Sequence, residues 1–326
     1  MIREKRLLCV LFALVLCAGC TAAPQQNAAM NTPAPLDTPA PTDAPADTPE
    51  PLTEAVALAT ETPVETEETE EPESPTAPAP EATPSPTPEP VMQERLDAGE
   101  FDSFFDDALF LGDSITESLD GYVRYLREAE GSMLGTTQMF GVKAMNVHIA
   151  CQDEPAPLDR TFRYRGKAVS VSEIINLCGP RRVFILMGVN DVCDRPWEDV
   201  AADFGQLIDN IHTKCPGVEV IIQGILPISA EYCTLKGITI ERYNSFNESV
   251  LAGVCEEHDA GFLNFSELMM DENGYLIDRL CNDRQYHLSW RGELVWVRAL
   301  RAYAAQQMIP GAEVIFNVDD YTKEDE

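Results

Sequence analysis

In Ala108-Leu109-Phe110-Leu111-Gly112-Asp113-Ser114-Ile115-Thr116, an apolar run ends abruptly at Gly-Asp-Ser. The run is typical of a buried strand, and the residues from Thr116 to Leu126 can continue as a helix. A serine at such a strand-to-helix turn exposes its hydroxyl, and its N–H lies at a helix N-terminus, where negative charge is favoured. Ser114 is therefore a candidate nucleophile, although an ordinary turn capped by Asp113 or Ser114 would look the same.

Apolar runs and amphipathic stretches alternate along the rest of residues 95–326. Further strands are predicted near 141–149 and over 182–187, 218–223 and 261–265, with helices over 170–177, 197–214, 239–258 and 289–307. Strands that are apolar along their whole length need cover on both faces, so the pattern predicts an α/β fold with a parallel sheet between two helix layers. Functional residues of such a sheet gather at the carboxyl ends of its strands.

Two more strand ends carry side chains suited to catalysis. Gly188-Val189-Asn190-Asp191 follows the most apolar strand, where glycine permits a sharp turn and the Asn190 amide could face an oxyanion; an Asx-turn would also explain it. His287 precedes the last helix, and the nearby Asp283 could hold it in one tautomer as a general base. A helix-capping histidine is the plainer alternative.

Three motifs resemble the first, third and fifth blocks of the SGNH/GDSL hydrolase family: Leu111 to Thr116, Gly188 to Asp191, and Asp283 to His287. The resemblance implies a flavodoxin-like three-layer α/β/α sandwich, the SGNH hydrolase fold. It also implies that Ser114 is the nucleophile and His287 the general base and then acid, with Asp283 completing the triad. Gly112, Asp113 and Gly188 are supporting residues of these blocks.

The family pattern also implies an oxyanion hole made of the Ser114 N–H, the Asn190 amide and a backbone N–H from a second-block glycine. In this chain no glycine stands where the family pattern expects one. Gly141 is the candidate, and Lys143 or Ala144 could occupy the position instead. The family commonly has its aspartate three residues before the histidine, where this chain has Arg284. Asp283 could still reach His287 if the loop bulges, or a backbone carbonyl could orient the imidazole.

Residues 1–20 have the features of a bacterial export signal. The basic segment Met1 to Arg6 precedes an apolar run that is too short to span a bilayer. Two small residues then precede Cys20, which resembles a lipoprotein signal and implies cleavage and lipidation at that cysteine. Cys17 stands where leucine is usual, so a plain signal peptide or an uncleaved anchor remains open. All three alternatives place the rest of the chain outside the cytoplasmic membrane.

Residues 21–94 are predicted to be a disordered, Pro/Thr/Glu-rich tether. They hold 17 of the 24 prolines and 15 acidic residues, with no lysine or arginine. Such a composition cannot bury enough apolar surface to fold, and proline stiffens it toward polyproline II, with an extended reach on the order of 200 Å. An interaction or glycosylated stalk is the alternative. Residues 95–326 then form the hydrolase-like domain.

Charge and cysteine content exclude several classes of partner. The chain has a formal net charge of −32, and residues 95–326 hold 20 basic against 39 acidic residues, which argues against nucleic acid and against direct adsorption to anionic lipid. Any membrane contact is then through the lipid anchor. An odd set of seven widely spaced cysteines follows the signal and does not indicate a disulfide framework. The histidines stand far apart, so no metal site or organic cofactor is expected.

The sequence therefore predicts an extracytoplasmic, membrane-anchored serine esterase that hydrolyses a carboxylic ester through an acyl-serine intermediate. An acylated glycan, with O-acetyl groups on a cell-wall or external polymer, is the expected substrate. A surface-tethered glycan-binding module with a degenerate site and an O-acyltransferase using the same serine are the alternatives. Residues 145–165 and 229–237 are expected to shape the substrate site.

Overall fold

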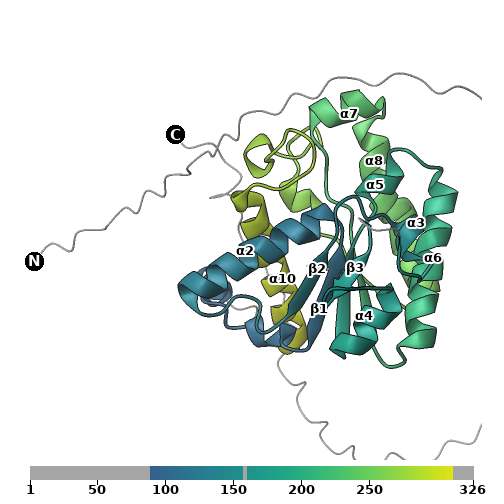
Figure 1. Ribbon diagram of the computed structural model, residues 1–326. Coiled ribbons are helices and arrows are strands. Elements are labelled where there is room, and N and C mark those ends of the chain that lie inside the picture. Colours follow the sequence, from purple (N-terminus) through teal and green to yellow (C-terminus); the bar gives the residue numbers. More distant parts are fainter. Residues whose placement is uncertain (1–88, 157–159, 311–326) are drawn as a thin grey trace, which may run out of the picture. The chain divides into compact units, whose positions relative to one another are not determined.

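Parallel strands form the central sheet in the order β2-β1-β5-β6-β7 (Figure 1). The computed structural model describes residues 89–156 and 160–310. The strands of this sheet are β1 (Ala108–Gly112), β2 (Gln138–Gly141), β5 (Arg182–Leu186), β6 (Glu219–Gln223) and β7 (Gly261–Leu263). Strands β1 and β5 are buried at every residue, and Phe110 stacks on Phe184 across them at 4.7 Å between ring centroids. The middle of the sheet is therefore the hydrophobic core.

Helices cover both faces of the sheet. On one side α2 and α10 pack together with α1, and on the other α6 contacts α3, α4 and α9 (Figure 1). The helices are α1 (Glu89–Asp97), α2 (Ser114–Glu130), α3 (Val147–Ala150), α4 (Val171–Cys178), α5 (Val189–Val192), α6 (Trp197–Lys214), α7 (Ala230–Lys236), α8 (Ile240–Phe246), α9 (Ala252–Glu257) and α10 (Trp290–Met308). Short helical segments are η1 (Asp102–Phe105), η2 (Asn247–Leu251), η3 (Ser266–Met269) and η4 (Asp278–Leu280). The predicted three-layer α/β/α sandwich is confirmed.

The second strand lies earlier than the sequence predicts. A strand over 141–149 was expected, but β2 ends at Gly141 and α3 begins at Val147. Asn146 caps α3 by accepting the Ile149 N–H at 2.9 Å, and Asp191 accepts the Val147 N–H at 3.0 Å. These two acceptors satisfy backbone groups that a strand would have paired with a neighbour, so the apolar residues here form a helical turn.

The two segments expected to shape the substrate site, 145–165 and 229–237, contain regular structure. The strands β3 (Phe162–Tyr164) and β4 (Lys167–Val169) pair antiparallel as a hairpin. Helix α7 occupies the second segment and is capped by Ser229, whose Oγ accepts the Tyr232 N–H at 3.1 Å. The first hairpin strand has only three residues, too few to show an alternating pattern in the sequence.

The domain begins before the boundary that the sequence indicates. The expected junction at 94 and 95 falls inside α1, and Met92 and Leu96 of this helix are buried. Arg301 of α10 forms a buried bidentate ion pair with Asp102, at 2.7 Å for both contacts. The signal at 1–20, the anchor at Cys20 and nearly all of the tether at 21–94 lie outside the described residues.

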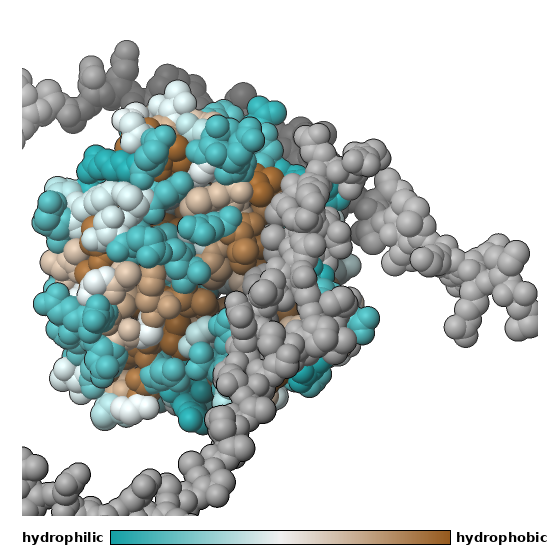
Figure 2. Space-filling view, turned by 180° about the vertical axis from the view of Figure 1, so that it is seen from behind, coloured by the Kyte–Doolittle hydropathy of each residue, from teal (hydrophilic) through white to brown (hydrophobic). Residues whose placement is uncertain are grey.

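The surface of the described domain is mixed in polarity. Figure 2 shows patches of apolar residues separated by hydrophilic ones on the rear face. None of the helices within 89–156 and 160–310 combines the length and apolar character needed to cross a bilayer. The seven cysteines of these residues are free thiols, and four of them are buried.

Candidate active site

Ser114 is the first residue of α2, directly after β1 and the cap Asp113. The Asp113 carboxylate accepts the Ile115 N–H at 2.9 Å and so starts the helix at the serine. Asp113 itself is fully buried, and burial raises the pKa of its carboxyl to about 7. Gly112, the last residue of β1, pairs with Leu186 of β5 and fixes this turn at the carboxyl edge of the sheet.

Ser114, His287 and Asp283 form a continuous hydrogen-bonded row. Ser114 Oγ lies 2.8 Å from His287 Nε2, and His287 Nδ1 lies 2.5 Å from Asp283 Oδ2. The His287 and Asp283 side chains are 31% and 30% exposed, so the row can be reached from solvent. The arrangement is that of a nucleophile, a base and a group that orients the base.

The loop before His287 wraps around the Asp283 carboxylate. Asp283 Oδ1 accepts the N–H groups of Gln285, Tyr286 and His287 at 2.8, 3.2 and 3.3 Å. Arg284 has a φ of +59°, the left-handed conformation that lets the chain bulge. Burial would raise the pKa of Asp283, but the bonds from the His287 ring and the Gln285 N–H outweigh it and lower that pKa. An aspartate four residues before the histidine thus reaches it, as an ionised carboxylate.

Two residues that sequence reasoning missed hold this loop in place. The Ser229 hydroxyl donates to the Arg284 carbonyl at 2.5 Å, and the Ser229 N–H donates to the Gln285 carbonyl at 2.8 Å. The Tyr286 ring lies 4.5 Å from the His287 ring, and its hydroxyl lies 3.4 Å from Asn190 Oδ1. Tyr286 lies within the Asp283 to His287 motif and Ser229 begins the segment 229–237, but only the contacts show what these two side chains do.

Asn190 stands beside the triad on the short helix α5. Gly188 caps this helix with a φ of +122°, a conformation that a side chain would strain. Asn190 Nδ2 donates to the Met145 carbonyl at 2.9 Å. Because a primary amide carries two N–H donors, one remains after this bond is made.

Gly141 has a packing reason to be glycine. A Cβ at this position would lie 2.0 Å from the Glu117 nitrogen, so its absence lets β2 approach the first turn of α2. Ala144, in the loop that follows, has a φ of +53°, which is the conformation glycine adopts most easily. The backbone of this loop therefore has a glycine-like conformation at Ala144. Ala144 is one of the two positions that the sequence offered, besides Gly141, for the second-block glycine.

Comparison with known proteins shows the family of this chain. Residues 110–294 match the GDSL-like lipase/acylhydrolase family. The chain belongs to this family. The match spans all three sequence blocks, so ester hydrolysis is the chain's general chemistry. No match was found among curated proteins.

Several solved structures are similar to this chain. A GDSL-like lipase from Bacteroides thetaiotaomicron is 16% identical, with a TM-score of 0.47, over 66% of this chain and 98% of its own. A Streptococcus pneumonia protein whose name refers to platelet activating factor is 21% identical, with a TM-score of 0.46, over 66% and 93%. A carbohydrate esterase family 3 protein from Talaromyces cellulolyticus is 14% identical, with a TM-score of 0.42, over 62% and 97%.

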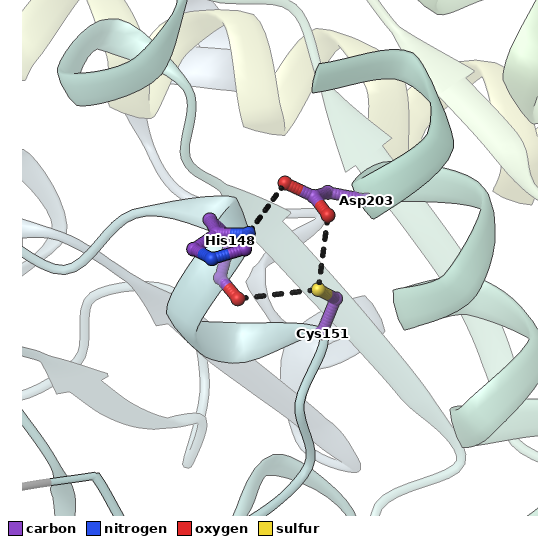
Figure 3. Close-up of side chains that lie close together, drawn as sticks. All are labelled: His148, Cys151 and Asp203. Atoms are coloured by element: carbon purple, nitrogen blue, oxygen red, sulfur yellow. Dashed lines mark hydrogen bonds and ion pairs between the residues drawn. The ribbon is translucent and has the colours of Figure 1, made fainter. Parts of the chain in front are cut away.

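A second cluster in this acylhydrolase joins His148 and Cys151 of the α3 turn to Asp203 of α6 (Figure 3). His148 Nδ1 lies 3.1 Å from Asp203 Oδ2, and Cys151 Sγ lies 3.3 Å from Asp203 Oδ1. The sequence placed His148 in a strand, and the absence of a metal site was expected because the histidines stand far apart. The helical turn instead brings it close to Cys151, three residues later, and both face Asp203.

Charge around this cluster favours a hydrogen-bonded brace. Arg195 lies 2.7 Å from Asp203 Oδ2 and 3.0 Å from Asp191 Oδ1, so the carboxylate already has a cationic partner. Burial, with a further contribution from Asp203, raises the pKa of the Cys151 thiol to about 12, which keeps it a neutral donor. Since Asp191 also accepts the Val147 N–H at 3.0 Å, the brace ties the second-block loop to α5 and α6.

Glu293 is a buried acid on the first turn of α10. Its side chain lies among residues of the helix layer, with 2% of the residue exposed. Burial raises its pKa from 4.5 to about 8, and the Ser118 hydroxyl opposes this rise without reaching hydrogen-bonding geometry. Glu293 is therefore mostly protonated at neutral pH in the folded protein and ionised in the unfolded chain.

The protonation of Glu293 predicts a pH-dependent stability. The contribution of Glu293 to the free energy of unfolding is fully present below pH 4.5. It falls as the pH rises from 4.5 to about 8, because only the folded state keeps the proton in this window, and it changes no further above that. Glu293→Gln removes this titration. The free energy of unfolding of the variant minus that of wild type is therefore expected to be about 2–4 kcal/mol higher at pH 8.5 than at pH 4.5. Urea unfolding across this range measures it, with the exposed Glu257→Gln as control. Parallel pH curves for wild type and Glu293→Gln would contradict the assignment.

Proposed function

We propose that this protein is a serine esterase that cleaves a carboxylic ester through an acyl-serine intermediate. The observation that carries the proposal is the row from Ser114 Oγ to His287 Nε2, at 2.8 Å, and from His287 Nδ1 to Asp283 Oδ2, at 2.5 Å. A serine hydroxyl is too weak an acid to attack an ester unaided, and an imidazole in this position can take its proton during the attack. The ionised Asp283 supports the imidazolium that forms.

The reaction proceeds in two steps. Ser114 Oγ attacks the ester carbonyl while His287 accepts its proton, and His287 then gives that proton to the departing alcohol. The remaining acyl-serine is attacked by water, whose proton passes to His287, and the carboxylic acid leaves as Ser114 is restored. The negative oxygen formed in each attack is stabilised by the Ser114 N–H at the N-terminus of α2 and by the second N–H of Asn190.

Replacing Asn190 by alanine tests the oxyanion role. Asn190→Ala is expected to lower kcat by about 10²- to 10³-fold with a much smaller change in KM, because the amide stabilises charge that exists only in the transition state. Steady-state hydrolysis of p-nitrophenyl acetate measures both constants. Asn210→Ala, which removes an amide donor to the Cys151 carbonyl at 2.8 Å, is the control for lost hydrogen bonding in this region. Equal losses in the two variants would point to a structural role for Asn190.

Labelling with a fluorophosphonate probe tests the proposal directly. An activated serine displaces fluoride from such a probe and becomes a phosphonate ester, so the labelled peptide should contain Ser114. Short acyl esters should also be hydrolysed. A protein that transfers the acyl group to an added sugar hydroxyl faster than to water would be an acyltransferase with the same triad. A glycan-binding module would bind without labelling or turnover. The contact between Asp283 and His287 supports the esterase over that alternative.

The proposed location is the outer side of a bacterial cytoplasmic membrane. It is supported by the basic and apolar residues of 1–20, by Cys20 after two small residues, and by the acidic, proline-rich 21–94. Mass spectrometry of the mature N-terminus, which would carry the lipid on Cys20, tests the anchor. A wall-spanning tether favours an O-acetylated glycan of the cell wall or surroundings as substrate.

A further inference from the structure

Basic residues gather at one place on this acidic domain. Five of the 20 lysines and arginines of residues 95–326 lie between positions 143 and 167. All five are exposed at the surface. We call them the basic rim: Lys143, Arg160, Arg163, Arg165 and Lys167. A local excess of positive charge in a chain with a net charge of −32 needs a physical reason.

The basic rim lies beside the nucleophile's helix. Phe140 of β2 and Tyr164 of the β3–β4 hairpin are 6.4 Å apart between ring centroids, so the hairpin packs on the edge strand. A cavity of about 310 Å³ is bordered by the edge strand, the hairpin and the first turn of α2, and Lys143, Arg163 and Glu117 are among the residues that line it. Glu117 is three residues after Ser114, within the same helical turn. A polymer bound along the hairpin would therefore pass close to the serine.

Basic residues elsewhere on the domain are largely neutralised within the protein. Arg124 pairs with Asp120, Lys214 with Asp153 and Lys236 with Asp194, at 2.9, 2.6 and 2.5 Å. Among the residues that the structure describes, Lys143, Arg160, Arg165 and Lys167 form no ion pair. The charge on these four residues is thus available to a partner.

The acidic residues of the same region do not cancel the rim. Asp153 turns inward, where it accepts the Ser172 N–H at 2.8 Å as well as the Lys214 bond. Glu117 and Glu154 are exposed, and each lines a cavity with one of the rim arginines. The four rim residues without an ion pair therefore outnumber the carboxylates of Glu117 and Glu154. Arg165 also lies over the Tyr164 ring at 5.3 Å, which holds its guanidinium on the hairpin.

We propose that the basic rim binds a polyanionic glycan, one that bears carboxylates or phosphates, and presents its ester to Ser114. The inference rests on the proposed esterase function and names its substrate class. A polyanion approaching this domain meets long-range repulsion, and the rim supplies the local attraction that selects the approach next to the serine. Carboxylate and phosphate oxygens suit the guanidinium groups of Arg160 and Arg165.

Charge variants of the full chain test the inference. Lys143→Gln/Arg163→Gln removes two charges from the cavity wall. Arg124→Gln/Arg181→Gln is the matched control, since Arg124 lies along α2 and the exposed Arg181 precedes the amino end of β5. The substrates are O-acetylated polygalacturonate, an O-acetylated polyol phosphate and O-acetylated neutral xylo-oligosaccharides. Activity on p-nitrophenyl acetate shows separately whether the wild-type chain is an esterase.

The expected result is a loss confined to the anionic polymers. In the rim variant the ratio of kcat/KM for a polyanion to that for the neutral oligosaccharide should fall about three- to tenfold, and 0.5 M NaCl should lower the wild-type ratio similarly. The control variant should stay within twofold of wild type. The two polyanions distinguish carboxylate from phosphate recognition. Binding of de-esterified polygalacturonate to Ser114→Ala protein, followed by calorimetry, gives a readout that needs no turnover.

Two outcomes would overturn the inference while leaving the esterase proposal intact. One is hydrolysis of p-nitrophenyl acetate together with equal polyanion ratios in the rim and control variants. The other is preferential binding of a synthetic peptide of residues 61–73, which holds seven acidic residues and no basic ones, because the rim would then be a contact for the chain's own tether. No hydrolysis of any ester by wild type would instead refute the proposed function itself.

Discussion

Replacing Ser114 by alanine is expected to lower kcat for a short acyl ester by about 10⁴- to 10⁶-fold and to abolish fluorophosphonate labelling. The hydroxyl is the only group of the triad that can form the acyl bond, so no neighbouring side chain replaces it. The oxyanion donors and the binding surface remain, which leaves a small residual rate above that of water. Stopped assays with p-nitrophenyl acetate measure the change.

A matched control separates the loss of the nucleophile from a folding defect. Ser132 is an exposed serine just after α2, and Ser132→Ala should retain activity within about twofold. Both variants should unfold at the same urea concentration as wild type. If Ser114→Ala kept more than a tenth of the wild-type activity, the serine esterase proposal would be wrong, whether or not the variant was less stable.

The second large effect is expected at Asp283. Asp283→Asn should lower kcat by about 10³- to 10⁴-fold near pH 7, because the amide presents an N–H to His287 Nδ1 and selects the tautomer that cannot accept the serine proton. The 2.5 Å contact to Nδ1 makes this substitution a direct test of the orienting carboxylate. If a backbone carbonyl oriented the imidazole instead, the loss would be less than tenfold.

The control for Asp283 comes from the same segment. Asp278 is an exposed acid on η4, five residues earlier, and Asp278→Asn should retain activity within about twofold. Asp283→Ala is informative beside it. This change also removes the acceptor for the N–H groups of Gln285, Tyr286 and His287, so it should lower stability by about 1–3 kcal/mol as well as activity.

The central sheet could be predicted from the sequence because its strands are apolar along their whole length. The runs that contain Leu109 and Phe184 are too apolar to lie anywhere but in a core covered on both faces, and their buried strands confirm it. The second strand was placed wrongly because the residues around Val147 are equally apolar in a strand or a helical turn. The caps at Asn146 and Asp191 decide between them, and Asp191 is 44 residues away.

In the candidate site, too, some residues could be predicted from the sequence and some contacts could not. Ser114, Asn190 and His287 could be proposed from sequence because each follows or precedes a recognisable element at the carboxyl edge of the sheet. The sequence could propose the reach of Asp283 only as one of two possibilities, because it depends on the left-handed backbone of Arg284 and on Ser229, which holds the loop from a distant segment. The partnership of His148 with Asp203 was missed for the same reason: it joins two helices.

The sequence by itself determined that an apolar strand ends at a serine on a helix N-terminus, because local apolar patterning and turn residues specify strand ends. It also determined the order of strands and helices, and the chemical types available at three of those ends. Only the tertiary structure decided which of these groups touch. Contacts such as Ser114 to His287, 173 residues apart, arise from the packing of whole elements, which no local pattern encodes. The same packing places the basic hairpin at a cavity shared with Glu117, one helical turn from Ser114, and so supports the inference about an anionic substrate.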